Sequence, residues 1–301
     1  MNYRVLPKIT DKQSEILDLV FRFRFINRHQ IQKLLNHKDP KRINVWLKDL
    51  VDKNYLGRIY SHKLLENTKP AIYFLNNNGI IWVRYNKCEE YQGDDLGLEI
   101  KYIKKFYQDK TASQTFINHC ITLSELYVQI KEYERNRNKD KKKRSLEDNI
   151  ETKTQMWINK QIDLNTNEDF NEVKQYIPDL YIEKVNNPDD DKNFKATTFF
   201  LELFDPHMPR YAIKYRIQQY IKYREEGSDW KMYSGSDESY PTIMLIFPHF
   251  RKLNGLTKFI EDELLRSYES ASIIFFLTTY QKIMTETIVG DKNIWKVIRG
   301  E

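Results

Sequence analysis

The segment Thr10–Leu75 constrains the fold more than any other, because it contains three helix-like patterns followed by two strand-like patterns. Thr10 or Asp11 can cap a first helix, since short polar side chains accept hydrogen bonds from the first backbone N–H groups. Its apolar residues recur at three- and four-residue spacing and would form one buried face: Ile16, Leu19, Val20 and Phe23. Asn27 can cap a short second helix. The inward residues of that helix would be Ile31, Leu34 and Leu35.

A third helix is expected to begin near Lys41, after the break at Asp39-Pro40. Its buried side would carry four apolar residues: Ile43, Leu47, Leu50 and Val51. Two apolar-rich runs follow, Leu56–Tyr60 and Ala71–Leu75, and the polar loop between them predicts a β-hairpin. Three helices followed by a hairpin is the element order of a winged helix-turn-helix.

The exposed face of the third helix is where we expect function. Five residues would point away from the apolar side: Lys41, Arg42, Asn44, Val45 and Lys48. Arg and Asn side chains can make bidentate hydrogen bonds to base edges. The loop of the hairpin, with Lys69 at its end, would form a wing within reach of phosphate. The predicted DNA-binding residues are Arg28, Lys41, Arg42, Asn44, Lys48, Arg58, His62 and Lys63.

Positive charge is concentrated in the first fifth of the chain. Residues 1–60 contain 13 Lys and Arg against six Asp and Glu, a net charge of +7, whereas the whole chain has 49 against 43, or +6. The remaining residues therefore carry a net charge of −1. A localised basic surface favours a polyanionic partner, and double-stranded DNA is the partner that this pattern predicts. The alternative is a solvated surface on a domain that docks proteins.

The chain of 301 residues is long enough for two domains, each with its own core. Its two cysteines, Cys88 and Cys120, are too few for a disulfide framework or a zinc site, as is typical of proteins in a reducing compartment. The longest apolar run, Ile273–Leu277, is far shorter than a bilayer span, and the N-terminus has no apolar signal segment. We therefore expect a cytoplasmic protein without a membrane partner.

Changes of pattern divide the chain into three predicted parts: a winged-helix DNA-binding domain at 1–90, a linker and long helix with a basic loop at 91–150, and an α/β domain at 151–301. One apolar stripe indicates the long helix: Phe116, Cys120, Leu123, Tyr127 and Ile130. Such a helix could pair two copies of the chain as a homodimer, or pack within one copy. The run at 135–144, with seven basic residues against one acid, predicts a solvated loop.

After residue 151, strand-like and helix-like runs alternate, which predicts an α/β domain with a mixed sheet. Strands are expected at 155–158, 178–182, 197–204, 242–247 and 272–278, and helices at 210–225 and 250–267. The run Thr197–Phe204 is almost continuously apolar, as in a central strand that is covered on both faces. The predicted fold class is therefore a winged helix-turn-helix followed by a mixed-sheet α/β domain, α+β or α/β overall.

Two carboxylates in the α/β domain could carry chemistry. Asp179 stands at the start of one expected strand, and Glu202 lies within the apolar strand, where a carboxylate is costly unless it is paired, protonated or bound to a metal. This arrangement resembles the PD-(D/E)XK nuclease superfamily, whose members hold Mg²⁺ with such acids. The resemblance implies that Asp179 and Glu202 are Mg²⁺ ligands. It also implies that they are catalytic, together with a lysine.

The lysine is where the chain departs from the nuclease pattern. That pattern places Lys two residues after the Glu, where this chain has Phe204. Lys214, on the following helix, could supply the amine instead. The alternative is a nuclease-like fold that has lost its active site, in which Glu202 and Asp205 bond Arg210 or Lys214. We favour this inactive form, which is not an enzyme and needs no cofactor.

Several segments, taken in order, resemble the replication-relaxation family of plasmid-borne proteins. They are residues 9–35 and 42–60, HCITL at 119–123, PDLYIE at 178–183, FFLELFD at 199–205 and IKYRIQQYIKY at 213–223. The resemblance implies DNA binding in plasmid replication, mobilisation or DNA relaxation, and it supplies no catalytic residues to carry over. The FFLELFD segment departs from the Glu-x-Asp-like ending that the family leads us to expect.

The leading hypothesis is a double-stranded DNA-binding protein of a plasmid or other mobile element, acting at an origin, with replication or relaxase proteins as further partners. A Mg²⁺-dependent endonuclease that uses Asp179, Glu202 and Lys214 is one alternative, and a winged-helix transcriptional regulator is another. A Walker loop, a Rossmann glycine pattern and zinc-ligand spacing do not occur in the sequence, which argues against NTP hydrolysis, dinucleotide binding and structural zinc.

Overall fold

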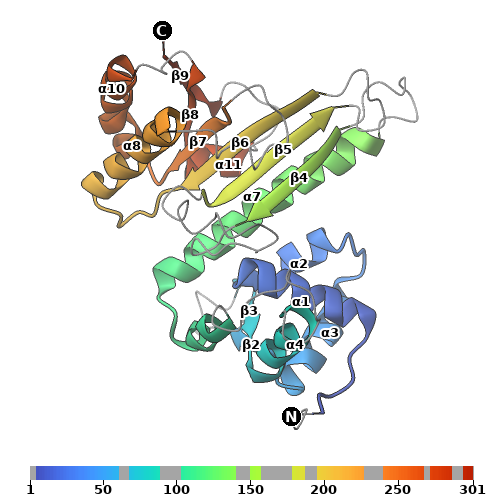
Figure 1. The fold of residues 1–301 in the computed structure, drawn as a ribbon. Helices are drawn as coiled ribbons and strands as arrows, with labels where there is room; N and C mark the ends of the chain where they lie inside the picture. Colours follow the sequence, from blue (N-terminus) through green and yellow to red (C-terminus); the bar gives the residue numbers. More distant parts are fainter. Residues whose placement is uncertain are drawn as a thin grey trace. The chain divides into compact units, whose positions relative to one another are not determined.

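The computed structural model divides the chain into two compact units, and the boundary falls inside one long helix. Unit 1 comprises residues 1–128 with 161–167, and unit 2 comprises residues 129–160 with 168–301. Figure 1 shows the elements of both. The structure describes residues 5–60, 68–88, 103–139, 150–156, 178–186, 195–226, 240–267, 272–286 and 294–300.

Unit 1 is built from helices and a small antiparallel sheet. In chain order its elements are α1 (Asp11–Phe23), β1 (Ile26–Asn27), α2 (Arg28–Leu34), α3 (Pro40–Asp52), β2 (Leu56–Ile59), β3 (Ile72–Leu75), α4 (Asn77–Lys87), the 3₁₀ helix η1 (Lys104–Thr111) and the first part of α7 (Gln114–Lys139), up to residue 128. The sheet has the order β1-β3-β2. The hairpin predicted from the sequence is therefore confirmed. The strand β1 was not predicted, because two residues are too few to show the alternating pattern of a strand.

The helix starts follow from local side-chain chemistry. Thr10 and Asn27 each form a capping box with the glutamine three residues later, Gln13 and Gln30, so the predicted caps of α1 and α2 are confirmed. Asp39 caps α3 and Pro40 occupies its first turn, where a missing N–H costs nothing. Asp39 and Pro40, which the sequence analysis identified as a break, therefore start α3.

The core of unit 1 contains the apolar faces of these helices. Fully buried members include Ile16, Leu17, Val20, Phe23, Ile31, Ile43, Leu47 and Leu50. Four predicted core positions, Leu19, Leu34, Leu35 and Val51, are only half-buried. In α1, Leu17 is buried in place of the predicted Leu19. In the short α2, whose last turn ends at Leu35, Ile31 contributes the buried apolar side chain.

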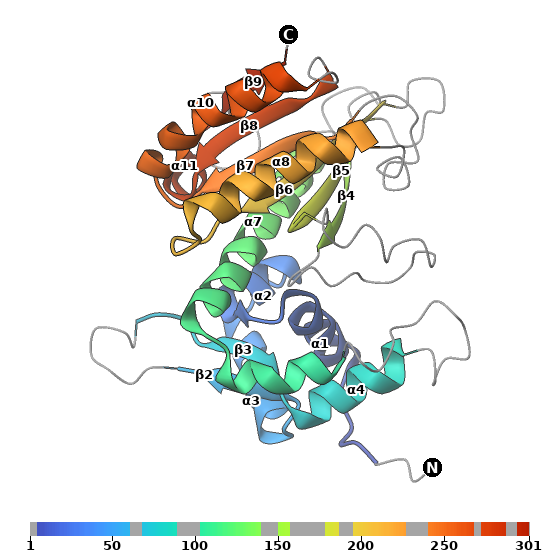
Figure 2. The same cartoon turned by 60° about the vertical axis from the view of Figure 1, so that its left-hand side comes forward.

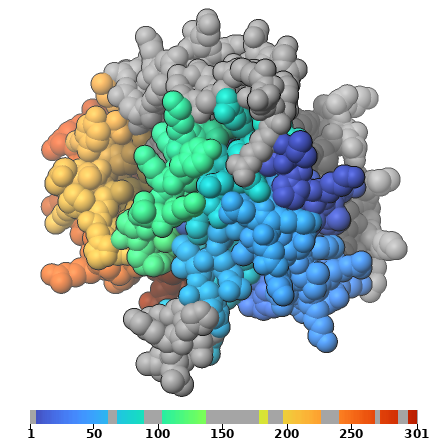
Figure 3. All heavy atoms as spheres, turned by 90° about the horizontal axis from the view of Figure 1, so that it is seen from below, coloured from blue at the N-terminus to red at the C-terminus, as the bar shows by residue number. Residues whose placement is uncertain are grey.

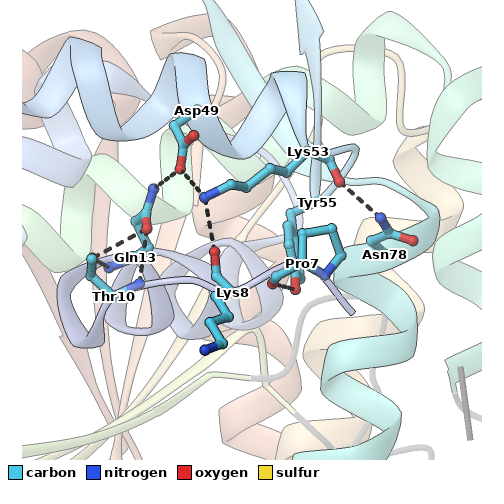
Figure 4. A network of polar contacts seen from close by, with 8 residues as sticks. All are labelled: Pro7, Lys8, Thr10, Gln13, Asp49, Lys53, Tyr55 and Asn78. Atoms are coloured by element: carbon cyan, nitrogen blue, oxygen red, sulfur yellow. Dashed lines mark hydrogen bonds and ion pairs between the residues drawn. The ribbon is translucent and has the colours of Figure 1, made fainter. Parts of the chain in front are cut away.

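A polar network orients α3 against α1 and α4 (Figure 4). Gln13 donates to the Asp49 carboxylate at 2.6 Å, and Lys53 donates to the same carboxylate at 2.7 Å and to the Lys8 carbonyl at 2.8 Å. The hydrogen bonds from Lys53 and Gln13 lower the pKa of Asp49. Asn78 in α4 donates to the Lys53 carbonyl at 2.8 Å. The end of α3 is thus held from three sides, which leaves its opposite face at the surface.

Gly79 in α4 lies close to the backbone of Tyr55, and a substitution there tests this packing. A Cβ atom there would lie 2.2 Å from the Tyr55 carbonyl oxygen, which is backbone and cannot easily move. We expect Gly79→Ala to lower the free energy of unfolding of unit 1 by about 1–3 kcal/mol. Hydrogen exchange of peptides from unit 1 measures this loss.

The matched control is Gly255, a helical glycine of unit 2. Its Cβ atom would meet Arg210 at 3.7 Å, which is ordinary contact. We expect Gly255→Ala to stabilise its helix by about 0.5–1 kcal/mol, because alanine loses less backbone entropy on folding. Equal effects of the two substitutions would contradict the assigned packing of Gly79.

A buried ion pair joins η1 to the rest of unit 1. Arg24, just after α1, donates to Asp109 in η1, and the two side chains are 7% and 0% exposed. The Arg24 guanidinium also lies over the rings of Phe106 and Phe116, at 5.3 and 4.8 Å from their centroids. Part of the stretch predicted as a linker, Lys104–Lys110, therefore packs into this unit.

Unit 2 is a six-stranded mixed sheet with helices. Its elements after α7 are β4 (Ile150–Met156), β5 (Leu180–Asn186), β6 (Lys195–Leu203), α8 (Arg210–Glu226), β7 (Thr242–Phe247), α10 (Phe250–Arg266), β8 (Ile274–Thr279), α11 (Tyr280–Glu286) and β9 (Lys296–Arg299). The strand order is β4-β5-β6-β7-β8-β9. The β6, β7 and β8 strands run parallel, and the other neighbouring pairs are antiparallel. The predicted mixed-sheet α/β architecture is confirmed.

The helices α8 and α10 lie side by side on one face of this sheet (Figures 1 and 2). They connect successive parallel strands, as right-handed crossovers do. The predicted central strand is confirmed, because β6 lies between β5 and β7. The sequence analysis missed the short helix α11. It also assigned residues 135–139 to a loop, whereas α7 continues to Lys139, and residues 140–144 lie outside the described ranges.

Among the helices that the structure describes, none combines the length and the apolar composition that crossing a bilayer requires.

Candidate functional site

One face of α3 presents polar and basic side chains to solvent. Ile43, Leu47 and Leu50 are fully buried, and the residues between them are exposed except Trp46 and Asp49, which are half-buried. The exposed set is Lys41, Arg42, Asn44, Val45 and Lys48, as predicted. Figure 3 shows the light-blue segment that contains α3 on the surface of unit 1. Such a face offers hydrogen-bond donors for an anion, an amide that can both donate and accept, and an apolar side chain in Val45, which is 64% exposed.

The start of α2 adds positive charge beside this face. Arg28 donates to the Asn44 side-chain oxygen at 3.4 Å, which links the first turn of α2 to the first turns of α3 and orients the Asn44 amide. Burial lowers the pKa of His29, and the nearby charges of Arg28 and Lys33 lower it further. The imidazole therefore remains neutral near pH 7, and the cationic groups here are the arginine and the lysine.

The β2–β3 hairpin carries a third part of the basic surface. Arg58 is exposed on β2, and its guanidinium lies 5.8 Å from the centre of the Tyr60 ring. Ile59, Tyr60 and Lys69 are also exposed. Two predicted DNA-binding residues, His62 and Lys63, lie outside the residues that the structure describes. The exposed Tyr60 was not predicted, although an aromatic residue at the end of an amphipathic strand could have indicated it.

A pair of carboxylates lies in unit 2, where the sequence analysis placed them. Leu180 pairs with Leu201 in the antiparallel ladder, and the Asp179 amide donates to the Leu201 carbonyl at 3.0 Å. Asp179 therefore stands opposite Glu202, and residues opposite each other share one face of a sheet. Both residues are buried. The two predicted acids are therefore brought together by the register of β5 on β6, which is a pairing between distant parts of the chain.

Each of these acids has hydrogen-bond partners. The Asp179 carboxylate accepts from the Leu203 amide at 2.8 Å. Glu202 accepts from Tyr220 at 2.7 Å and from the Arg216 guanidinium at 3.1 Å. Burial raises the pKa of Tyr220 well above its usual value of 10.0, so this phenol stays protonated and donates.

The third predicted member of the site is directed elsewhere. The Lys214 ammonium lies 4.4 Å from the centre of the Phe259 ring, on the side of α8 that meets α10. Residues two apart on a helix point about 200° apart, so Lys214 and Arg216 cannot share one carboxylate. Of the expected pairing of Glu202 and Asp205 with Arg210 or Lys214, the structure gives Glu202 a different cation, Arg216, and Arg210 donates to the Gly255 carbonyl.

The acid pair does not fit a Mg²⁺ ion. A Mg²⁺ ion needs carboxylate oxygens in octahedral geometry and open positions for water. Here the Arg216 guanidinium takes the place of a cation on Glu202, and Phe204, on the same strand face, packs on Phe247 at 5.2 Å between ring centres. Within the described ranges, no group of three or more His, Cys, Asp or Glu is placed to hold a metal.

Sequence reasoning missed Arg216 and Tyr220 as the partners of Glu202. Their four-residue spacing on a predicted helix placed them on one face, and this was the available signal. Tyr240, also missed, donates to the Tyr220 carbonyl at 2.7 Å and closes the cluster. Nothing in the local sequence says which strand that helix face will cover.

The comparisons with known proteins identify a family. A family model described as replication-relaxation matches residues 17–238, a range that begins within α1 and includes α3, Asp179, Glu202 and α8. The comparisons with curated proteins and with solved structures found no match. The chain therefore belongs to the replication-relaxation family, which indicates a role in the replication or relaxation of a mobile element.

Proposed function

We propose that this protein binds double-stranded DNA of a plasmid or other mobile element through unit 1, which acts as a winged helix-turn-helix. The observation that carries the proposal is the exposed face of α3, with Lys41, Arg42, Asn44 and Lys48 on the side opposite the buried core. The major groove of B-DNA is wide enough to admit such a helix. Asp49 does not interrupt this face, because it is bonded to Gln13 and Lys53.

The side chains divide into two roles in this proposal. Arg42 and Asn44 contact base edges, since Arg pairs with guanine and Asn with adenine through two hydrogen bonds each. Val45 meets a thymine methyl group. The remaining cations, including Arg28, Lys41, Lys48 and Arg58, contact phosphate and position the helix without reading sequence. The β2–β3 hairpin is the wing, and Arg58 and Lys69 bring it to the DNA backbone.

For unit 2 we propose a nuclease-like fold whose acids are structural. The hydrogen bonds of Asp179 and Glu202 to protein groups support this assignment, because they account for both buried carboxylates without a metal. Unit 2 would then serve as a platform for a replication or relaxase protein or for a second copy of the chain. A purely transcriptional role would use the same α3 surface and differ only in the site bound.

The test is a gel-shift titration with duplex DNA from the native neighbourhood of the gene and with a scrambled duplex. We expect Arg42→Ala and Asn44→Ala each to weaken specific binding by about 1–3 kcal/mol and to reduce the preference for the native duplex. Lys48→Ala should weaken binding to both duplexes equally and lower the salt dependence by about one counterion. Unchanged affinity and preference in the Arg42 and Asn44 variants would overturn the proposal.

The control variant is Lys12→Ala, which removes an exposed cation of α1 that pairs with Glu15. It should bind like the original protein. The same titration on supercoiled plasmid, with Mg²⁺ and with EDTA, distinguishes DNA binding from the nuclease alternative. We expect an equal shift in both buffers with the plasmid still supercoiled. Metal-dependent nicking that Asp179→Ala abolishes would contradict the structural role of the acids.

A further inference from the structure

Unit 2 exposes aromatic rings where its helices α8 and α10 begin. Tyr211 and Tyr215 on α8 are 76% and 60% exposed, and Phe250, the first residue of α10, is 62% exposed. Other aromatic residues of this unit, such as Phe200, Tyr220 and Phe247, are instead buried. Tyr211 and Tyr215 are one helical turn apart and therefore lie on the same face of α8. A soluble helix has no packing reason to present this much ring surface to water.

The first turns of both helices are basic, although Tyr215 also lines a pocket that contains Glu225 and Glu263. Residues 207–218 and 249–260, all of them described, contain six Lys and Arg and no Asp or Glu. Arg216 is committed to Glu202. The other five cations are Arg210, Lys214, Arg251, Lys252 and Lys258. The surrounding charge is therefore complementary to a polyanion, although unit 2 contributes none of the excess positive charge of the chain.

A cavity of about 320 Å³ lies between the two helices in this region. Its cationic and histidine lining is Arg210, His249, Arg251 and Lys252, and its apolar lining includes Ile213 and Leu256. Arg210 is held in place by donation to the Gly255 carbonyl, and Lys252 by donation to the carbonyls of Pro206 and Met208 at 2.7 and 2.9 Å. A guanidinium has five N–H donors, so Arg210 can contact an anion while keeping this bond.

We propose that this surface, which we call the α8–α10 patch (Arg210, Tyr211, Tyr215, Phe250, Arg251 and Lys252), binds single-stranded DNA. Exposed rings among cations are the combination that such binding uses, because unpaired bases stack on the rings and phosphates lie along the cations. A duplex hides the faces of its bases, so the rings would gain nothing from it.

This inference goes beyond the duplex binding proposed for unit 1 and does not depend on it. Binding a duplex through one unit and a single strand through the other suits a protein of replication or relaxation, because both processes open duplex DNA. The two activities are carried by different residues. Their loss can therefore be separated by substitution in the full-length chain.

The experiment measures fluorescence anisotropy of a labelled single-stranded 20-mer of thymidylate with the full-length protein. Arg42→Ala is present throughout, which weakens the contribution of α3 to binding. We expect Tyr211→Ala, Tyr215→Ala and Phe250→Ala each to weaken binding roughly tenfold, the loss of one stacked base. Arg251→Ala should reduce the salt dependence of binding by about 0.7 in the logarithmic slope.

Two matched controls accompany these variants. Tyr211→Phe keeps the ring and should bind as before, whereas Leu265→Ala removes an exposed apolar side chain (75% exposed) near the other end of α10 and should have no effect. The alanine variants, made without the Arg42 substitution, should shift duplex DNA normally. Unchanged single-strand affinity in the three aromatic variants would overturn the proposal. Equal loss in the Leu265 control would overturn it as well.

A second measurement locates the strand. An oligonucleotide that carries 5-bromodeoxyuridine is cross-linked to the protein by ultraviolet light, and the modified peptides are identified. We expect cross-links at Tyr211, Tyr215 or Phe250. Cross-links confined to unit 1, or binding of anionic lipid vesicles without binding of the single strand, would contradict the assignment.

Discussion

Replacing Arg216 with alanine should lower the free energy of unfolding of unit 2 by about 3–5 kcal/mol, because it leaves the buried Glu202 carboxylate without its cation. Glu202 lies inside β6, away from water, and Arg216 is the guanidinium within 3.1 Å of it. Tyr220 can still donate one hydrogen bond, but a neutral phenol does not balance a charge. The carboxylate must then be protonated or expose itself by local opening.

The measurement is hydrogen exchange of peptides from β6 and α8, because a chain with two units need not unfold in one step. Lys258→Ala, which removes an exposed cation of α10, is the control and should change exchange by less than about 0.5 kcal/mol. The double substitution Glu202→Leu with Arg216→Leu should recover much of the lost stability, since no buried charge remains. If Arg216→Ala alone left exchange unchanged, the pairing with Glu202 would be refuted.

Replacing Asp109 with alanine should have an effect of similar size on unit 1, about 3–5 kcal/mol. Arg24 is 6% exposed, and its guanidinium does not lose its proton at any ordinary pH, so removing the carboxylate leaves a permanent buried charge. The hydrogen bonds from Arg24 to Asp109 are also lost, and of the hydrogen bonds from Arg24 to η1 the bond to the Lys105 carbonyl remains. Exchange of peptides from η1 and the start of α7 should increase most. The exposed pair Lys12–Glu15 supplies the control, because Glu15→Ala should cost less than about 1 kcal/mol.

The pH dependence of Asp109 has a definite sign. Burial raises its pKa to about 6, from an ordinary value of 3.8, although the hydrogen bond and charge of Arg24 act in the opposite direction. Between these two values the folded protein binds a proton that the unfolded chain has released. The part of the stability that depends on the protonation of Asp109 is therefore fully present below about pH 4 and is lost as the pH rises through 6.

Comparison with Asp109→Asn isolates this contribution, because the amide keeps an acceptor oxygen for Arg24 but cannot ionise. We expect the stability of the original protein relative to this variant to fall as the pH rises from 4 to 7. Unfolding followed by denaturant titration at several pH values measures the difference. A difference that rises with pH would mean that Arg24 lowers the pKa of Asp109 more than burial raises it.

Local pattern was enough to predict the elements that carry the proposed DNA surface. The caps at Thr10 and Asn27 and the apolar period of α3 depend on residues within one or two turns, so they are readable before any tertiary structure is known. The same period, by exclusion, identified Arg42, Asn44 and Lys48 as the exposed face. The continuous apolar run of β6 likewise indicated an interior strand.

The tertiary structure alone decided which groups these elements meet. The sequence marked Asp179 and Glu202 as unusual, but their position opposite each other follows from the β5–β6 register, and the choice of Arg216 over Lys214 follows from the rotation of α8 on the sheet. The Arg24–Asp109 pair spans 85 residues and places part of a predicted linker in a core. Contacts at such separation depend on how whole elements pack, and no local period records that packing.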